Sequence, residues 1–212
     1  MSIQALIDDC QYLTINRRAT TASTISRSKR LKTSERGYRV WEFNVVPSPG
    51  YQYDTNRDLL EQIDTVDRIT EEQISFSNNS GLAYITEYKG DMSQLQADAI
   101  TISSVSGTTI TLTDLPTAGS STILFAKGDY IQPAGSRYPY TVINTVYRGT
   151  ETTVDVEVNR GVIEDITMAG ASIYIGDAIS WRVKALNMPT YSIAPGRHIV
   201  WEGDLLLMEV IV

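Results

Sequence analysis

Side chains that favour β-strands dominate this sequence, and no other feature constrains its fold as strongly. Val, Ile, Thr, Tyr, Phe and Trp together occupy 78 of the 212 positions. Branched and aromatic side chains fit the pleated, half-buried surface of a sheet. Because 42% of the residues are hydrophobic, the chain can also bury a sizeable core. The composition therefore predicts a mainly β fold and argues against a helical bundle.

Turn residues divide the chain into two patterns of strands. Between residues 98 and 175, short strand-like segments alternate with turns, and the segment 154–158 (VDVEV) alternates most regularly. A set of about five to seven such strands predicts a small antiparallel β-barrel at 98–175. We expect this barrel to be inserted into an outer β-sandwich or split-barrel-like domain. Residues 1–97 would form that domain, and the C-terminal strands of 176–212 would complete it.

Local patterns in the outer domain predict one hairpin and one packed helix. The polar segment 20–32 and the aromatic segment 38–45 are expected to pair across a turn at 35–37. Apolar residues at helical spacing predict the helix at 56–67, with Thr55 as its N-cap.

Further along the chain, the pattern predicts a second hairpin and a buried final strand. Segments 74–76 and 82–88 flank an Asn-rich turn and are expected to pair. Segments 91–97 and 189–195 are expected to be connections. The continuous apolar run 205–212 predicts a strand buried on both faces or docked against another subunit.

Motifs for catalysis and for metal or cofactor binding are absent from the sequence. A single cysteine, Cys10, excludes a disulfide framework and Cys-based metal centres, and a single histidine, His198, removes most metallohydrolase patterns. No glycine-rich phosphate loop, G-x-S-x-G turn or H-E-x-x-H motif occurs. We therefore expect no enzyme, no catalytic residues, no cofactor and no metal site.

The N-terminal segment does not resemble a signal peptide. It has no basic region, and Asp8 and Asp9 interrupt its apolar residues. The apolar runs are far shorter than the roughly 20 residues that cross a bilayer. We therefore expect synthesis in the cytoplasm and no membrane partner.

Positive charge is concentrated near the start of the sequence. Residues 1–40 contain eight Lys or Arg and three Asp or Glu, and the other residues contain ten and 22, so the net charge of −7 combines +5 with −12. Aromatic residues do not alternate with these charges as they do in nucleic-acid platforms, so we expect no direct nucleic-acid partner. Charge complementarity between subunits is the preferred interpretation. The candidate interface residues are Arg27, Lys29, Arg30, Lys32, Leu205, Leu207, Val210 and Val212.

Three groups of turn and strand residues carry a resemblance to a known family. The first is RGYRVWEFNV at 36–45, the second comprises FAKGDYI at 125–131 and VDVEVNRG at 154–161, and the third comprises LNMP at 186–189 and WEGDL at 201–205. In this order they resemble the opening hairpin, the small inserted domain and the closing strands of distal-tail-type and related baseplate hub proteins of tailed bacteriophages.

The resemblance implies a structural virion protein without catalytic activity. Such proteins form a ring, commonly a hexamer, at the distal end of the tail tube, and they join the tube to baseplate or receptor-binding components. The implied partners are therefore further copies of the chain, the tail tube and other baseplate or tail-tip proteins. The implied location is the virion tail, after assembly in the host cytoplasm.

Two alternatives remain open at this point. One is a carbohydrate-binding β-sandwich, in which Trp41, Tyr51, Tyr53 or Trp201 would be stacking platforms for sugar rings. The other is a glycan hydrolase of the tail. The sequence offers no recognisable pair of carboxylates for that reaction.

Overall fold

The computed structural model describes residues 2–17, 21–25, 27–35, 39–65, 69–76, 81–163 and 168–211. The protein is mainly β, with 41% strand and 14% helix arranged around several antiparallel sheets. This confirms the fold class predicted from the composition.

Two compact units make up the chain. Unit 1 combines Met1–Glu72 with Val183–Ile211, and unit 2 contains the continuous segment Gln73–Arg182. The expected boundaries at 98 and 175 both lie inside unit 2. The ring centroids of Phe76 and Trp181 are 5.2 Å apart, and both side chains are fully buried. Residues on either side of the expected barrel therefore contribute to the core of unit 2.

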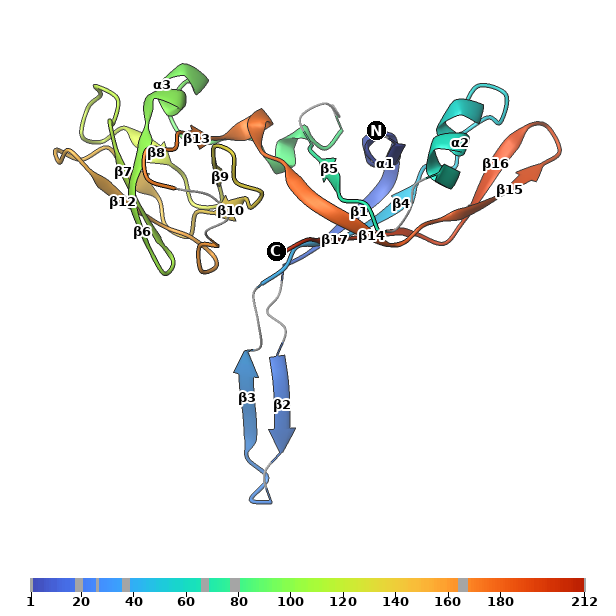
Figure 1. Ribbon diagram of the computed structural model, residues 1–212, viewed down its shortest axis with the longest axis horizontal. Coiled ribbons are helices and arrows are strands. Elements are labelled where there is room, and N and C mark those ends of the chain that lie inside the picture. The colour runs from blue at the N-terminus through green and yellow to red at the C-terminus, as the bar shows by residue number, and fades with distance from the viewer. Residues whose placement is uncertain are drawn as a thin grey trace. The chain divides into compact units, whose positions relative to one another are not determined.

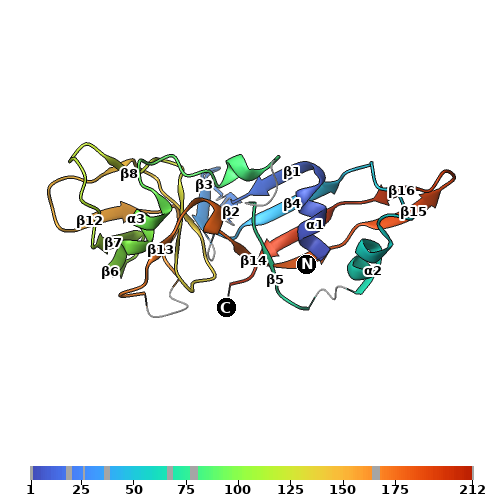
Figure 2. The same cartoon turned by 90° about the horizontal axis from the view of Figure 1, so that it is seen from above.

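A sheet with the strand order β1–β4–β17–β14 forms the centre of unit 1 (Figures 1 and 2). Its strands are β1 (Cys10–Asn16), β4 (Glu42–Pro47), β17 (Leu205–Glu209) and β14 (Trp181–Asn187). β5 (Glu72–Ile74) is the next strand in this order, and the division between the units falls within β5 and β14. Helix α1 (Ser2–Asp8) lies across the sheet and contacts β1 and β4.

The two central strands of this sheet alternate between buried and partly exposed side chains. In β4, Phe43 and Val45 are fully buried, and in β17 the same is true of Leu205 and Leu207. Phe43 lies directly opposite Leu207 in the antiparallel register. Alternation with a period of two places these side chains on the face that packs against the core.

Two hairpins and one further helix complete the part of unit 1 that the structure describes. Their bounds are β2 (Thr21–Ile25), β3 (Leu31–Glu35), β15 (Thr190–Ala194), β16 (His198–Glu202) and α2 (Arg57–Thr65). Helix α2 packs against the β15–β16 hairpin, because Leu60 shares a buried cluster with Ile199 and Tyr51. The β2–β3 hairpin is a separate two-stranded sheet (Figure 1).

The described residues of unit 2 form three small sheets with the orders β10–β9–β13, β12–β7–β6 and β11–β8. The strands are β6 (Thr101–Ser106), β7 (Thr109–Thr113), β8 (Ile123–Phe125), β9 (Tyr130–Pro133), β10 (Tyr140–Thr141), β11 (Val146–Tyr147), β12 (Val154–Glu157) and β13 (Ile173–Tyr174). As predicted, β12 buries Val156 and exposes Asp155 and Glu157. Closure of these sheets into a barrel stays a prediction.

The predicted pairing of segments 20–32 and 38–45 is wrong. β2 pairs instead with β3, and β4 lies between β1 and β17. The reason is the distribution of apolar residues. Trp41, Phe43 and Val45 require a core-facing strand, whereas segment 20–32 has too few apolar side chains to cover a sheet face.

Three other local predictions are also wrong. Part of segment 82–88 forms the 3₁₀ helix η1 (Ala83–Ile85) instead of a strand, and residues 77–80 lie outside the described residues. Segment 91–97 contains most of helix α3 (Gln94–Ala99), and the expected connection 189–195 contains β15.

The helix predicted at 56–67 is present as α2, whose described part is Arg57–Thr65. Residues 66–68 lie outside the described residues. Thr55 is not at the helix boundary, and its hydroxyl donates a hydrogen bond to the carbonyl oxygen of Gln52. Within the described part of the chain, no helix is both long and apolar enough to cross a membrane.

Replacing Leu207 with Ala should lower the free energy of unfolding by about 2–5 kcal/mol, because the smaller side chain leaves a cavity in a fully packed core. Met208→Ala is the matched control, since the adjacent Met208 is 39% exposed. It should lower the unfolding free energy by less than about 1 kcal/mol. Urea unfolding followed by circular dichroism would measure both values, and equal losses would contradict the alternation of β17.

Candidate functional site

The β2–β3 hairpin carries four of the candidate interface residues. Arg27, Lys29 and Arg30 lie in the turn, and Lys32 is the second residue of β3. All four side chains are exposed. Lys29 has a positive φ of 57°, so its backbone adopts the left-handed conformation that tight turns often need. The sequence predicted this basic charge on a strand, and the structure places most of it at a hairpin tip.

An apolar pair lies directly beneath the basic turn. Ile25 and Leu31 are cross-strand partners and are 71% and 68% exposed, respectively. The remaining residues of the two strands are small or polar apart from the charged Lys32 and Glu35. The hairpin therefore presents an apolar contact and a cluster of positive charge next to each other.

None of the described side chains of this hairpin is buried in a hydrophobic core. Among the described strands, β2 and β3 pair only with each other. An isolated two-stranded hairpin is marginally stable in water, and each of its strands leaves one edge of backbone donors and acceptors unpaired. Docking against another surface would stabilise such a hairpin and would cover or pair its open strand edges.

The C-terminal candidate residues lie elsewhere in unit 1. Leu205 and Leu207 are fully buried in the core of the chain itself, so neither side chain is exposed to a neighbouring subunit. Val210 is half-buried, and Val212 lies outside the described residues. Within this chain the run is not buried on both faces, because the intervening Met208 is exposed, and the alternative that it docks against another subunit stays a prediction.

The predicted sugar platforms do not form one exposed surface. Trp41 is 1% exposed and stacks on Phe43 at a centroid distance of 6.2 Å. Tyr51 is also buried and meets the half-buried Trp201 edge to face at 5.7 Å. These three aromatic residues and Tyr53 pack in the interior of unit 1 or beside α2. Their main contribution is therefore to packing.

The single cysteine and the single histidine of the sequence both belong to unit 1, and Cys10 lies near Asp9 and Tyr51. Burial raises the pKa of the Cys10 thiol, which favours its protonated, poorly nucleophilic form. His198 is exposed at the start of β16. Arg197 donates a hydrogen bond of 2.7 Å to Asp54, and this bond lowers the pKa of the carboxyl group. Within the described residues, no group of three His, Cys, Asp or Glu side chains could hold a metal ion.

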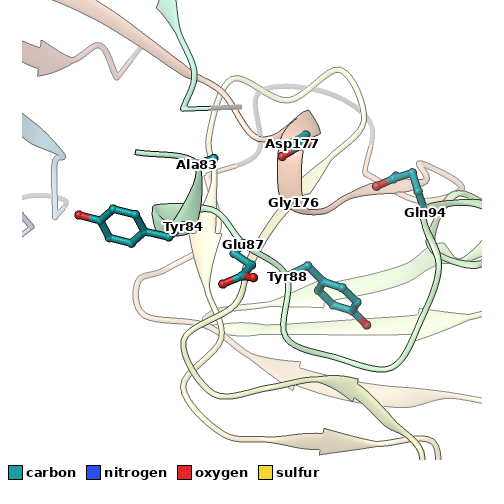
Figure 3. Close-up of a pocket in the computed structure, with 7 residues that line it drawn as sticks. All are labelled: Ala83, Tyr84, Glu87, Tyr88, Gln94, Gly176 and Asp177. Atoms are coloured by element: carbon teal, nitrogen blue, oxygen red, sulfur yellow. The ribbon is translucent and has the colours of Figure 1, made fainter. Parts of the chain in front are cut away.

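Unit 2 contains a hollow of about 490 Å³ that the sequence did not indicate. Its lining residues are Ala83, Tyr84, Glu87, Tyr88, Gln94, Gly176 and Asp177 (Figure 3). Figure 3 shows the rings of Tyr84 and Tyr88 projecting in different directions from the same segment. Tyr84 is 67% exposed, so its ring is accessible to a ligand.

Tyr88 is a fixed wall of this hollow. Its hydroxyl donates a hydrogen bond to the carbonyl oxygen of Leu124 and accepts one of 3.3 Å from the backbone N–H of Met92. Gly90 makes this position possible, because a Cβ atom there would collide with the Tyr88 hydroxyl. The sequence does not indicate this hollow, because the pattern of segment 82–88 predicts a strand.

Helix α3 contributes Gln94 to the same hollow, and one signal in the sequence could have revealed it. Ser93 and Gln96 form a capping box, in which each side chain accepts a hydrogen bond from the backbone N–H of the other residue. A Ser followed three residues later by Gln or Glu is a known start signal for helices. The polar composition of segment 91–97 nevertheless favours a connection.

In comparisons with known proteins, no protein-family model matches the chain, and no curated protein sequence matches it. The candidate surfaces are therefore assessed from their own chemistry.

Alkaline pH should destabilise unit 2 through Tyr88. Burial raises the pKa of its hydroxyl from 10.0 to about 12. The folded state therefore keeps this proton at pH values where the unfolded chain has lost it. The resulting stability is complete below pH 10 and is lost as the pH rises through about 12.

Tyr88→Phe removes this titrating group, so the unfolding free energy should fall less steeply between pH 10 and 12 than in the native chain. Urea unfolding at a series of pH values would measure the slopes. Tyr147→Phe is the matched control, because Tyr147 is 53% exposed. A slope that is identical in the native chain and in Tyr88→Phe would contradict the burial of this hydroxyl.

Proposed function

We propose that this protein is a structural virion protein of a phage tail, a distal-tail or baseplate subunit that forms an oligomeric ring. The ring would join the tail tube to baseplate or receptor-binding components. The observation that carries the proposal is the β2–β3 hairpin, whose Ile25–Leu31 pair is exposed and none of whose described side chains is buried in a hydrophobic core. The resemblance in the sequence motifs supports the same function.

Docking of the hairpin on a neighbouring subunit would stabilise both partners. Covering Ile25 and Leu31 removes two large apolar side chains from water, and each fully buried side chain of this kind contributes about 1.5–3 kcal/mol. The neighbour would also pair or cover the open strand edges. A contact between a hairpin and a different part of the next copy is heterologous, and such contacts close into rings when the rotation allows.

Charge complementarity would guide the same contact. The basic turn belongs to a chain with a net charge of −7, so a second copy presents mainly acidic surface. On α2, for example, Asp58 and Glu61 are both exposed. Exposed charges of opposite sign raise association rates and fix orientation more than they add affinity, and salt screens them.

Neutralising Arg27, Lys29, Arg30 and Lys32 together to Gln should weaken assembly most at low salt. Sedimentation velocity at about 50 mM and about 500 mM NaCl would measure the oligomer, since the Debye length shortens severalfold over this range. The native chain should assemble less well at high salt, and the variant should show little dependence on salt. Unchanged oligomerisation of the variant would contradict the role of the basic turn.

Two controls separate the hairpin from general effects of charge and surface. Neutralising Arg57, Lys89, Lys127 and Lys184, which lie outside the hairpin, should leave assembly and its salt dependence close to native. Ile25→Ser combined with Leu31→Ser should weaken assembly at both salt concentrations, whereas Leu95→Ser, at an 81% exposed position, should not. A native chain that stays monomeric, alone and with tail-tube subunits, would overturn the proposal.

Carbohydrate binding is the second candidate function, and the hollow of Figure 3 favours it. The exposed ring of Tyr84 could stack on a sugar, and the side chains of Glu87, Gln94 and Asp177 could bond its hydroxyl groups. In this hypothesis Tyr84 is the stacking platform, in place of the aromatic residues that the sequence suggested for that role.

For this second function, Tyr84→Ala should abolish oligosaccharide binding measured on a glycan array and by calorimetry. Tyr12→Ala is the matched control, because Tyr12 is 64% exposed in unit 1 and should bind like the native chain. A monomeric chain whose sugar binding depends on Tyr84 would favour the binding module over the ring. If the native protein binds no glycan, the carbohydrate-binding function is excluded.

A further inference from the structure

A second hollow of unit 2, of about 410 Å³, differs from that of Figure 3 in its charge. Two of its lining residues are arginines, Arg137 and Arg182, and none of the lining residues that the structure describes is acidic. This arrangement is unusual in a chain with a net charge of −7. Its volume lies within the range of roughly 300–1,000 Å³ that is typical of small-molecule sites.

A buried amide organises the floor of this hollow. Gln132 of β9 is 3% exposed. Its Nε2 donates a hydrogen bond of 2.9 Å to the carbonyl oxygen of Ser136, and its Oε1 accepts one of 3.0 Å from the backbone N–H of Ser180. The turn after β9 and the segment that leads into β14 are therefore held in fixed positions. Fixed supporting groups of this kind preorganise a binding site.

Hydroxyl groups line the hollow next to the arginines. The Ser180 Oγ accepts a hydrogen bond of 2.9 Å from Gln73 Nε2, so its own proton can be donated in another direction. Tyr174 is 37% exposed and supplies a phenolic hydroxyl. Several side chains that can donate hydrogen bonds to oxygen atoms therefore line the same hollow.

Arg182 provides the most accessible positive charge. Its side chain is exposed, and it forms no ion pair with any residue that the structure describes. Arg137 is half-buried and adds a second positive charge. A guanidinium group presents several N–H donors in a planar fork, which matches the oxygen pairs of carboxylates and phosphates.

We propose that this hollow binds a small ligand through an oxyanion, a phosphate or a carboxylate, with Arg182 and Arg137 supplying charge and Ser180 and Tyr174 donating hydrogen bonds. Within a preorganised polar hollow, charge-assisted hydrogen bonds are stronger than those on an open surface. All of these residues belong to unit 2, whereas the hairpin of the proposed ring contact belongs to unit 1. It is also separate from the hollow around Tyr84, with which it shares no lining residue.

The test uses the full chain titrated with inorganic phosphate and, separately, with acetate. Both titrations are followed by NMR chemical shifts at constant ionic strength, which removes general effects of screening. We expect saturable shifts at the backbone amides of Ser180 and Arg182 with at least one probe. Saturation by phosphate alone, by acetate alone or by both identifies the anion that the site prefers.

Arg182→Gln should weaken binding of the probe at least about tenfold, because it removes a charge-assisted contact worth more than about 1.4 kcal/mol. Lys184→Gln is the matched control, since Lys184 lies two residues further along β14 and outside the hollow. It should bind like the native chain. Ser180→Ala should weaken binding severalfold while keeping the backbone N–H that bonds Gln132.

The proposal is overturned if neither probe gives saturable shifts in the native chain. It is also overturned if Arg182→Gln and Lys184→Gln bind the probe equally. Circular dichroism of each variant confirms that the fold is retained, and substitutions at the exposed Arg182 and the half-buried Lys184 leave the core unchanged. Failure of this test leaves the assembly experiments on the hairpin unaffected, because those depend on unit 1.

Discussion

The sheet of unit 1 depends on the pairing of strands from distant parts of the sequence. β17 lies between β4 and β14, and its backbone joins them into one sheet. The contact is fixed at one end by Glu209, whose N–H donates to the carbonyl oxygen of Trp41 at 2.8 Å and whose carboxylate accepts from the Trp41 N–H at 3.2 Å. A carboxyl group that is only 2% exposed requires such partners. The pair therefore helps to specify the register in which Phe43 faces Leu207.

The β2–β3 hairpin is the opposite case, because among the described strands β2 and β3 pair only with each other, and none of their described side chains belongs to the buried core. The core of unit 1 is filled without any contribution from Ile25 or Leu31. These residues can therefore be changed without opening a cavity, which separates effects on assembly from effects on folding. A stable sheet that carries a hairpin with an exposed apolar pair suits a subunit that binds a neighbour, and this is the basis of the proposed ring.

Composition and alternation were sufficient to predict the fold class and several strands. β12 shows why, since its valines and acids alternate with the period of a strand and leave no competing interpretation. Pairing partners were not predictable in the same way. The local pattern predicts that β4 pairs with the nearest preceding segment, whereas it pairs with β1 and β17. Local patterns do not contain the information on contacts between residues that are far apart in the sequence.

The candidate sites were harder to predict than the fold, because their residues come from separate segments. The hollow with two arginines combines side chains near Gln73, Gln132 and Ser180, and no short motif connects them. The same contacts have a consequence for folding. Gln73 and Ser180 lie within hydrogen-bond distance, so a folded unit 2 closes a loop of just over one hundred residues, whose closure entropy is about 4 kcal/mol plus a constant. The bond therefore holds together the two points at which the chain enters and leaves unit 2.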